Sequence, residues 1–124
     1  TLFPYTTLFR SDVIANLQET AYMLEAVRSL LGNRPILITS GYRSPELNRA
    51  IGGSSNSDHM YGRAADFTCP GYGRPYDVCK AIEASGMQFN QLIYEFASWV
   101  HLSWAPTNRQ QTLTIDNRGT RYGI

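Results

Sequence analysis

The stretch S-D-H-M-Y-G-R-A-A-D-F-T, residues 57–68, combines a turn with a strand-like run and decides how the chain folds around it. Its second half alternates, with Ala65 and Phe67 on one face and Asp66 on the other. Gly62 lets the chain turn between the loop and this strand. A carboxylate on an apolar strand needs a partner or a metal, because burying an unpaired charge is costly.

A second alternating run, W-V-H-L-S-W, occupies residues 99–104 and places His101 on one face together with Trp99 and Ser103. If this run neighbours the first strand, Asp66 and His101 stand side by side, and His59 reaches in from the loop. Two imidazoles and one carboxylate suit Zn²⁺, and three protein ligands leave a fourth position for water. The alternative is that the spacing is accidental. A single His-x₆-Asp pattern is weak evidence of a metal site.

The remaining pattern predicts helices and further strands around these two runs. The first helix carries apolar residues at three- and four-residue steps: Val13, Leu17, Ala21, Leu24, Val27 and Leu31. We expect helices at residues 12–31, 45–51 and 76–85, and strands at 36–39, 63–68, 91–96, 99–104 and 112–115. This order predicts an α+β domain, with a small, mostly antiparallel sheet flanked by helices.

Length and composition exclude several classes of protein. The chain has 124 residues, enough for one domain, and its formal charge of +1 offers no basic field for nucleic acid. Its apolar runs are too short to span a membrane, and we expect a monomer.

Cys69 and Cys79 are the two cysteines, and either a disulfide or two free buried thiols is compatible with their spacing.

The first eleven residues, T-L-F-P-Y-T-T-L-F-R-S, do not fit the pattern of the rest. From Leu2 to Ser11 they resemble the translation of a sequencing-adapter oligonucleotide, and they lack the charged start of a signal peptide. We therefore expect residues 1–11 to be non-native and residues 12–124 to form the domain, with the native N-terminus missing.

Three motifs together resemble the M15 peptidases, the D-Ala-D-Ala carboxypeptidases and related peptidoglycan peptidases. The segment S-x-H-x-x-G-x-A-x-D, residues 57–66, resembles the first zinc signature of that family. Trp99-Val100-His101 resembles its second signature, and S-G-Y-R-S-P-E-L-N, residues 40–48, its upstream arginine motif. The resemblance covers residue 12 to about residue 104 and is closest to the M15A branch, which includes phage-type domains. It implies a fold like that of hedgehog domains and DD-peptidases.

The resemblance also implies roles for individual residues. His59, Asp66 and His101 match the three zinc ligands of the family. Arg43 matches the arginine that holds a substrate carboxylate or polarises the scissile carbonyl, tasks that suit a planar guanidinium. Ser57 matches the motif serine that shapes the substrate pocket, although it can equally be a loop cap.

The general base departs from the family pattern. Several M15 branches have an acidic residue three positions before the last histidine, where this chain has Ser98. The nearest acid is Glu95, and a tight connection after it would fold its carboxylate back over the metal. We therefore expect Glu95 to be the base, with Asp58 as the weaker alternative.

The resemblance implies a zinc-dependent peptidase that hydrolyses peptidoglycan stem peptides or cross-links, of the D-Ala-D-Ala carboxypeptidase or endopeptidase type. One alternative is an L-Ala–D-Glu endopeptidase of a phage lysin. A second is a catalytically impaired cell-wall binding module, which the serine at position 98 keeps open. The substrate implies a periplasmic or extracellular location at the cell wall, or a phage enzyme that acts on the host wall.

Overall fold

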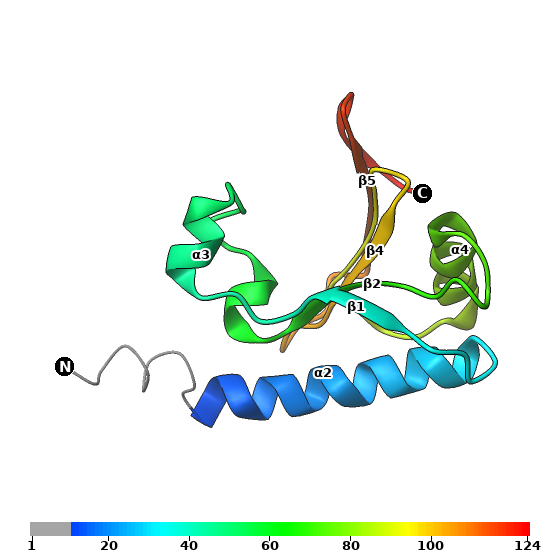
Figure 1. Cartoon of the computed structure of the whole chain (residues 1–124), viewed down its shortest axis with the longest axis horizontal. Coiled ribbons are helices and arrows are strands. Elements are labelled where there is room, and N and C mark those ends of the chain that lie inside the picture. Colours follow the sequence, from blue (N-terminus) through cyan, green and yellow to red (C-terminus); the bar gives the residue numbers. More distant parts are fainter. Residues whose placement is uncertain (1–10) are drawn as a thin grey trace.

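A six-stranded sheet organises the chain in a computed structural model that describes residues 11–124 (Figure 1). The prediction for residues 1–11 falls, apart from Ser11, outside the described residues. The elements in chain order are α2 (Ser11–Leu30), β1 (Leu37–Ser40), α3 (Pro45–Ala50), the 3₁₀ helix η1 (Asp58–Tyr61), β2 (Ala64–Thr68), α4 (Pro75–Ser85), β3 (Gln91–Glu95), β4 (Trp99–Ser103), β5 (Gln111–Asp116) and β6 (Gly119–Tyr122).

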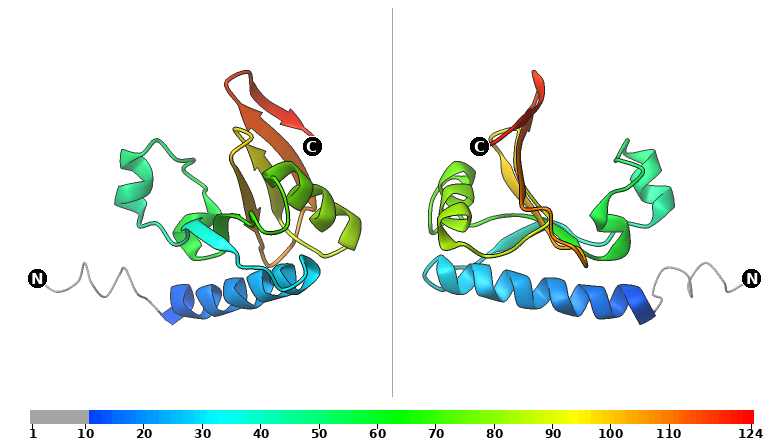
Figure 2. Two further views of the ribbon diagram at one scale, coloured as in Figure 1. Left: turned by 45° about the vertical axis from the view of Figure 1, so that its right-hand side comes forward. Right: turned by 180° about the vertical axis from the view of Figure 1, so that it is seen from behind.

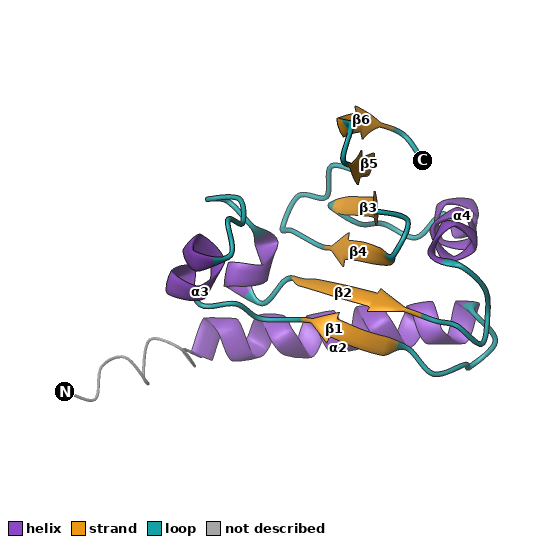
Figure 3. Ribbon diagram, turned by 45° about the horizontal axis from the view of Figure 1, so that its top comes forward, coloured by secondary structure: helices purple, strands orange, loops and turns teal. Residues whose placement is uncertain are grey.

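The strand order β1-β2-β4-β3-β5-β6 confirms the predicted α+β class with a mostly antiparallel sheet (Figure 3). The pair β3–β5 is the exception, since these strands run parallel with Gln91 opposite Gln111. Every predicted helix and strand is present, each within about one residue of its expected bounds. Two elements, η1 and β6, were not predicted; both are four residues long, and β6 exposes most of its side chains.

One face of the sheet forms the core with α2 and α4, while α3 and η1 lie on the other side of the sheet (Figure 2). Ala65 and Phe67 of β2 point into this core, as the alternation predicts, together with Val100 and Leu102 of β4. The other buried members come from the helices, β3 and the adjoining loops: Val27, Leu31, Cys69, Val78, Cys79, Ile82, Phe89 and Leu92. The opposite face of β2 and β4 is therefore available for polar groups.

Helix α2 supports that polar face through a buried threonine. The Thr20 hydroxyl donates to the Gly62 carbonyl at 2.6 Å and accepts from the Trp104 indole nitrogen at 2.9 Å. Thr20 is 4% exposed, whereas Ala21, which the apolar pattern assigns to the buried stripe, is exposed. These hydrogen bonds turn the threonine inward, and the buried stripe of α2 therefore includes a polar residue that its apolar spacing does not show. No described helix is long and apolar enough to cross a bilayer.

Both cysteines are buried and unbonded, so the free-thiol alternative is correct for this chain. They belong to the same core cluster but lie on different elements, Cys79 on α4 and Cys69 after β2. Burial raises the pKa of the Cys79 thiol to about 12, which disfavours its reactive thiolate.

The connection between β3 and β4 has three residues, 96–98, and the first two lie in the left-handed region. Phe96 and Ala97 have φ angles of 52° and 55°, and the Ser98 amide donates to the Glu95 carbonyl at 2.9 Å. Two consecutive positive φ values are typical of a type I′ hairpin turn, in which glycine is preferred at the second position. Ala97 therefore holds a conformation that costs an L side chain about 1 kcal/mol.

We expect Ala97→Gly to raise the free energy of unfolding by roughly 0.5–1 kcal/mol, because glycine adopts this φ without steric cost. Chemical denaturation monitored by circular dichroism measures the change. Ala26→Gly is the matched control: Ala26 is exposed within α2, so the same substitution there should destabilise by about 1 kcal/mol. A loss of stability in Ala97→Gly would contradict the turn assignment.

Candidate metal centre

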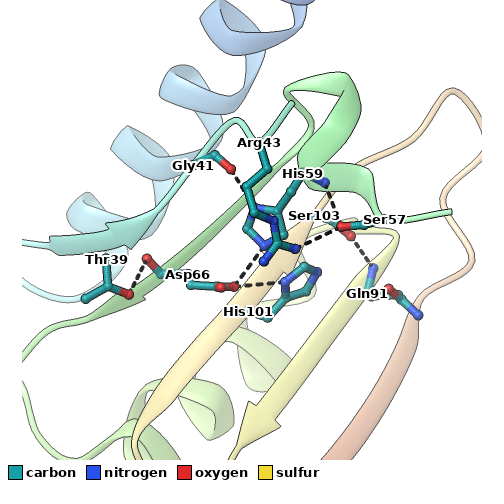
Figure 4. Close-up of polar contacts among 9 residues, drawn as sticks. All are labelled: Thr39, Gly41, Arg43, Ser57, His59, Asp66, Gln91, His101 and Ser103. Carbon is teal, nitrogen blue, oxygen red and sulfur yellow. Dashed lines mark hydrogen bonds and ion pairs between the residues drawn. The ribbon is translucent and has the colours of Figure 1, made fainter. Parts of the chain in front are cut away.

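Asp66 and His101 lie directly opposite each other on the antiparallel pair β2–β4. The Asp66 Oδ1 atom is 2.9 Å from His101 Nδ1. Figure 4 draws this contact as a dashed line. The register of β1 against β2 shifts opposite Asp66, between Ile38 and Ser40. The predicted side-by-side placement of the carboxylate and the imidazole is therefore confirmed, and it follows from strand pairing alone.

His59 reaches the same carboxylate from η1, with its Nε2 atom 3.2 Å from Asp66 Oδ1. The Ser57 hydroxyl accepts from the His59 amide and caps this short helix, and Gly62 ends it with a φ of 74°. A Cβ atom at Gly62 would lie 3.1 Å from the Val13 carbonyl oxygen, so both space and conformation favour glycine there. The packing of η1 against α2 thus sets the position of His59.

The hydrogen bonds of His59 test whether this group suits a cation. Its Nδ1 atom lies 2.7 Å from the Gly41 carbonyl oxygen, which can only accept, so Nδ1 carries the proton. A neutral His59 ring then presents the lone pair of Nε2 toward an Asp66 carboxylate oxygen. Two acceptors at that separation repel each other unless a proton or a metal ion lies between them. In metal-binding histidines, the ring nitrogen that does not bind the metal often donates to a backbone carbonyl, as His59 does here.

The donor set matches a zinc site in type and in spacing. One ligand atom from each of His59, Asp66 and His101 lies within 4.8 Å of the other two, and all three residues are buried. The Nε2 atom of His101 is buried without a hydrogen-bond partner in the described chain, so the polar contact of this ring is on its Nδ1 side. Two nitrogens and one carboxylate oxygen are donors that Zn²⁺ commonly takes in open sites.

The charge state of Asp66 agrees with a ligand role. Burial by itself would raise the pKa of the Asp66 carboxyl, but the hydrogen bonds and charges of His101 and His59 lower it well below its usual range. The group is therefore a carboxylate near neutral pH, in the form that binds a cation.

A cavity of about 580 Å³ opens over the three residues and brings in the other predicted site residues. Its wall includes Arg43 before α3, Ser57 and Asp58 at the start of η1, and Glu95 at the end of β3. Among its apolar members are Ile93, Leu113 and Ile115, from the neighbouring strands β3 and β5. All predicted site residues thus share one cavity, while their functional roles stay predictions.

Arg43 is held in this wall by neutral partners. Its amide donates to the His59 carbonyl at 3.0 Å, and its Nη2 donates to the Ser57 hydroxyl at 3.1 Å. Its Nε atom is buried and has no hydrogen-bond partner within residues 11–124. Ser57 therefore both caps η1 and positions the guanidinium, so that the two readings of this serine are compatible.

Glu95 ends β3 at the tight turn that the prediction required. Burial in the cavity wall raises the pKa of its carboxyl; the charges of His101, His59 and Arg43 lower it, and Asp66 raises it further. A raised carboxyl pKa is typical of a group that exchanges protons with a substrate or with water.

Sequence reasoning missed several polar residues of this cavity, among them Asn90 and Arg109. Asn90 is 4% exposed and donates from Nδ2 to Asp58 Oδ2 at 2.8 Å. Its Oδ1 accepts from Arg109 Nε at 2.9 Å. Neither residue lies in a recognisable motif, and only the fold brings the loop after β4 back to the start of β3.

Comparison with known proteins agrees with this geometry. A zinc D-Ala-D-Ala carboxypeptidase from Streptomyces albus G is 48% identical over 52 residues, which make up 42% of this chain and 20% of that protein. The chain thus matches about one fifth of the length of that relative. A family model described as Peptidase M15 matches residues 5–103, which include all three candidate ligands and Glu95. The chain therefore belongs to the Peptidase M15 family.

Proposed function

We propose that this chain is a zinc-dependent peptidase that hydrolyses bacterial cell-wall peptides of the D-Ala-D-Ala type. The observation that carries the proposal is the convergence of His59, Asp66 and His101 in the wall of a cavity that also holds Glu95 and Arg43. The similarity to the Streptomyces albus G carboxypeptidase supports the substrate class. Such peptides lie outside the cytoplasmic membrane, so we place the enzyme at the cell wall or in the periplasm.

His59, Asp66 and His101 would hold the zinc ion through the three facing donor atoms. Zinc in such a site supplies Lewis acidity, which polarises a carbonyl group and makes water a better nucleophile near neutral pH. The Gly41 carbonyl keeps His59 in one tautomer, and the β2–β4 pairing fixes Asp66 against His101. The protein therefore presents its donors in a fixed arrangement.

Glu95 would act as the proton carrier of the reaction. Its carboxylate accepts a proton from the attacking water and then donates it to the amine that leaves when the peptide bond breaks. Partial burial suits both steps, because it brings the pKa of the carboxyl closer to the working pH. The tight turn at Phe96 and Ala97 holds this carboxylate at the cavity wall.

Arg43 would bind an oxygen of the substrate, either the scissile carbonyl or a nearby carboxylate. Its Nε atom is buried without a hydrogen-bond partner in the described chain, and one of its Nη atoms is already fixed by Ser57. A guanidinium held in this way donates to a developing negative charge with little reorganisation.

His101→Ala should remove the bound metal. The chain should contain about one zinc ion by elemental analysis after purification, and the variant should bind zinc at least ~100-fold more weakly, because one of three protein ligands is lost. Leu102→Ala is the matched control: its side chain is buried in the core on the other face of β4, so it should lose stability and keep zinc. Equal zinc content in His101→Ala and the wild type would refute the site.

Glu95→Gln should retain zinc and lower kcat by about 10²-fold or more, because the amide cannot carry the proton. The effect is measured as the rate at which D-alanine is released from a synthetic peptide ending in D-Ala-D-Ala. Glu19→Gln, an exposed position on α2, should leave kcat unchanged. If Asp58→Asn abolishes hydrolysis while Glu95→Gln does not, the proton carrier is Asp58.

Digestion of purified peptidoglycan distinguishes the D-Ala-D-Ala activity from cleavage at L-Ala–D-Glu. We expect mass spectrometry to detect released D-alanine or separated cross-links, since the carboxypeptidase relative acts on D-Ala-D-Ala. Free stem peptides cut after L-alanine would overturn the proposed substrate and leave the zinc site intact. Zinc binding without any hydrolysis would instead indicate a binding module.

A further inference from the structure

A second guanidinium enters the cavity from a loop outside the region matched by the family model. Arg109 lies between β4 and β5, beyond residue 103, and lines the same cavity as Arg43. The two arginines are anchored differently: Arg43 binds Ser57 beside η1, and Arg109 binds Asn90 just before β3. Two cationic groups are thus available to one bound peptide.

Asn90 fixes Arg109 without neutralising its charge. The Asn90 Oδ1 atom accepts from Arg109 Nε at 2.9 Å and from the Arg109 amide at 3.4 Å. The backbone of Asn90 is itself held in place. Its backbone N–H donates to the Ser103 carbonyl, and its backbone carbonyl accepts from the Gln111 N–H. The donor edge formed by the two Nη atoms of Arg109 has no partner within the described part of the chain.

Four of the other described arginines differ from Arg109, because each of them pairs with a carboxylate. The paired atoms are 3.6 Å or less apart: Arg28 with Glu25, Arg74 with Asp77, and both Arg118 and Arg121 with Asp116. The nearest carboxylate in the Arg109 network is Asp58, whose Oδ2 accepts from Asn90 instead. An arginine oriented by a neutral amide, with its Nη edge unpaired, is suited to bidentate binding of a carboxylate from a ligand.

We infer that Arg109 recognises a carboxylate of the bound peptide, distinct from the oxygen that Arg43 binds. The inference rests on the proposed function, since it takes the ligand to be a cell-wall peptide, and it adds that this peptide is anionic at a second position. Asn90 acts as a positioning residue, because its side-chain oxygen accepts hydrogen bonds from Arg109. Arg109 is then a specificity-determining residue for acidic peptides.

Equilibrium binding tests the inference independently of catalysis. The protein is the zinc-loaded chain with Glu95→Gln, which slows turnover. The probes are a synthetic peptide with an upstream D-glutamyl carboxylate and a terminal D-Ala-D-Ala, and its two mono-amides, each neutral at one carboxylate. We expect amidation of one of the two carboxylates, the one that Arg109 binds, to raise the dissociation constant about 10-fold, as measured by calorimetry. Arg109→Met should weaken binding of the unmodified peptide to the same extent.

The two changes should not add. In Arg109→Met, amidation of the carboxylate that Arg109 binds should not weaken binding further. Amidation of the other carboxylate should weaken binding as much as it does before the substitution. Arg109→Lys should recover only part of the affinity, because lysine cannot bind Asn90 and a carboxylate through one planar group. Arg49→Met, which removes the same charge from an exposed position outside the cavity, should retain both amidation effects.

The outcomes separate the inference from the proposed function. Suppose that the unmodified peptide binds, and that each amidation weakens binding by the same factor with and without the Arg109→Met substitution. Arg109 then contacts no substrate carboxylate, and the inference is overturned. If the zinc-loaded protein binds none of the three peptides, the proposed substrate class is wrong and the inference falls with it.

Discussion

One buried carboxylate, Asp66, determines the arrangement of the site. It stands on the polar face of a strand whose other face is core, and it contacts an imidazole on each side, at 2.9 Å and 3.2 Å. A lone carboxylate there would be strongly destabilising, so the fold must supply cationic or donor partners. The surrounding structure does this twice: strand pairing provides His101, and η1 provides His59.

The scaffold and the site use opposite faces of the same strands. Helices α2 and α4 cover the apolar face, and α2 also reaches the edge of the polar side through Thr20, which binds the Gly62 carbonyl and the Trp104 indole. Helix α2 therefore supports η1, the short helix that carries His59, although α2 contributes none of the three candidate ligands. Because the core orders β2 and β4, little further ordering is needed to bring the donor atoms together.

Alternation and motif spacing predicted much of this arrangement. The strands around Asp66 and His101 follow from side-chain period, and their pairing makes the two residues neighbours. What sequence could not supply was non-local. The parallel alignment of β3 with β5 has no local signal, and Arg109 and Asn90 meet only because of it. The exposed four-residue strand β6 and the short helix η1 are too brief for periodicity to reveal.

The strand order has a consequence for how the molecule acquires its structure. Asp66 and His101 are 35 residues apart in sequence, and the strand ending at Glu95 pairs in parallel with residues 111–115. Contacts of such long sequence separation must close large loops before they stabilise anything, so folding is slow relative to a helical domain of similar size. The three donor residues span positions 59–101, so no short peptide excised from the chain contains all of them.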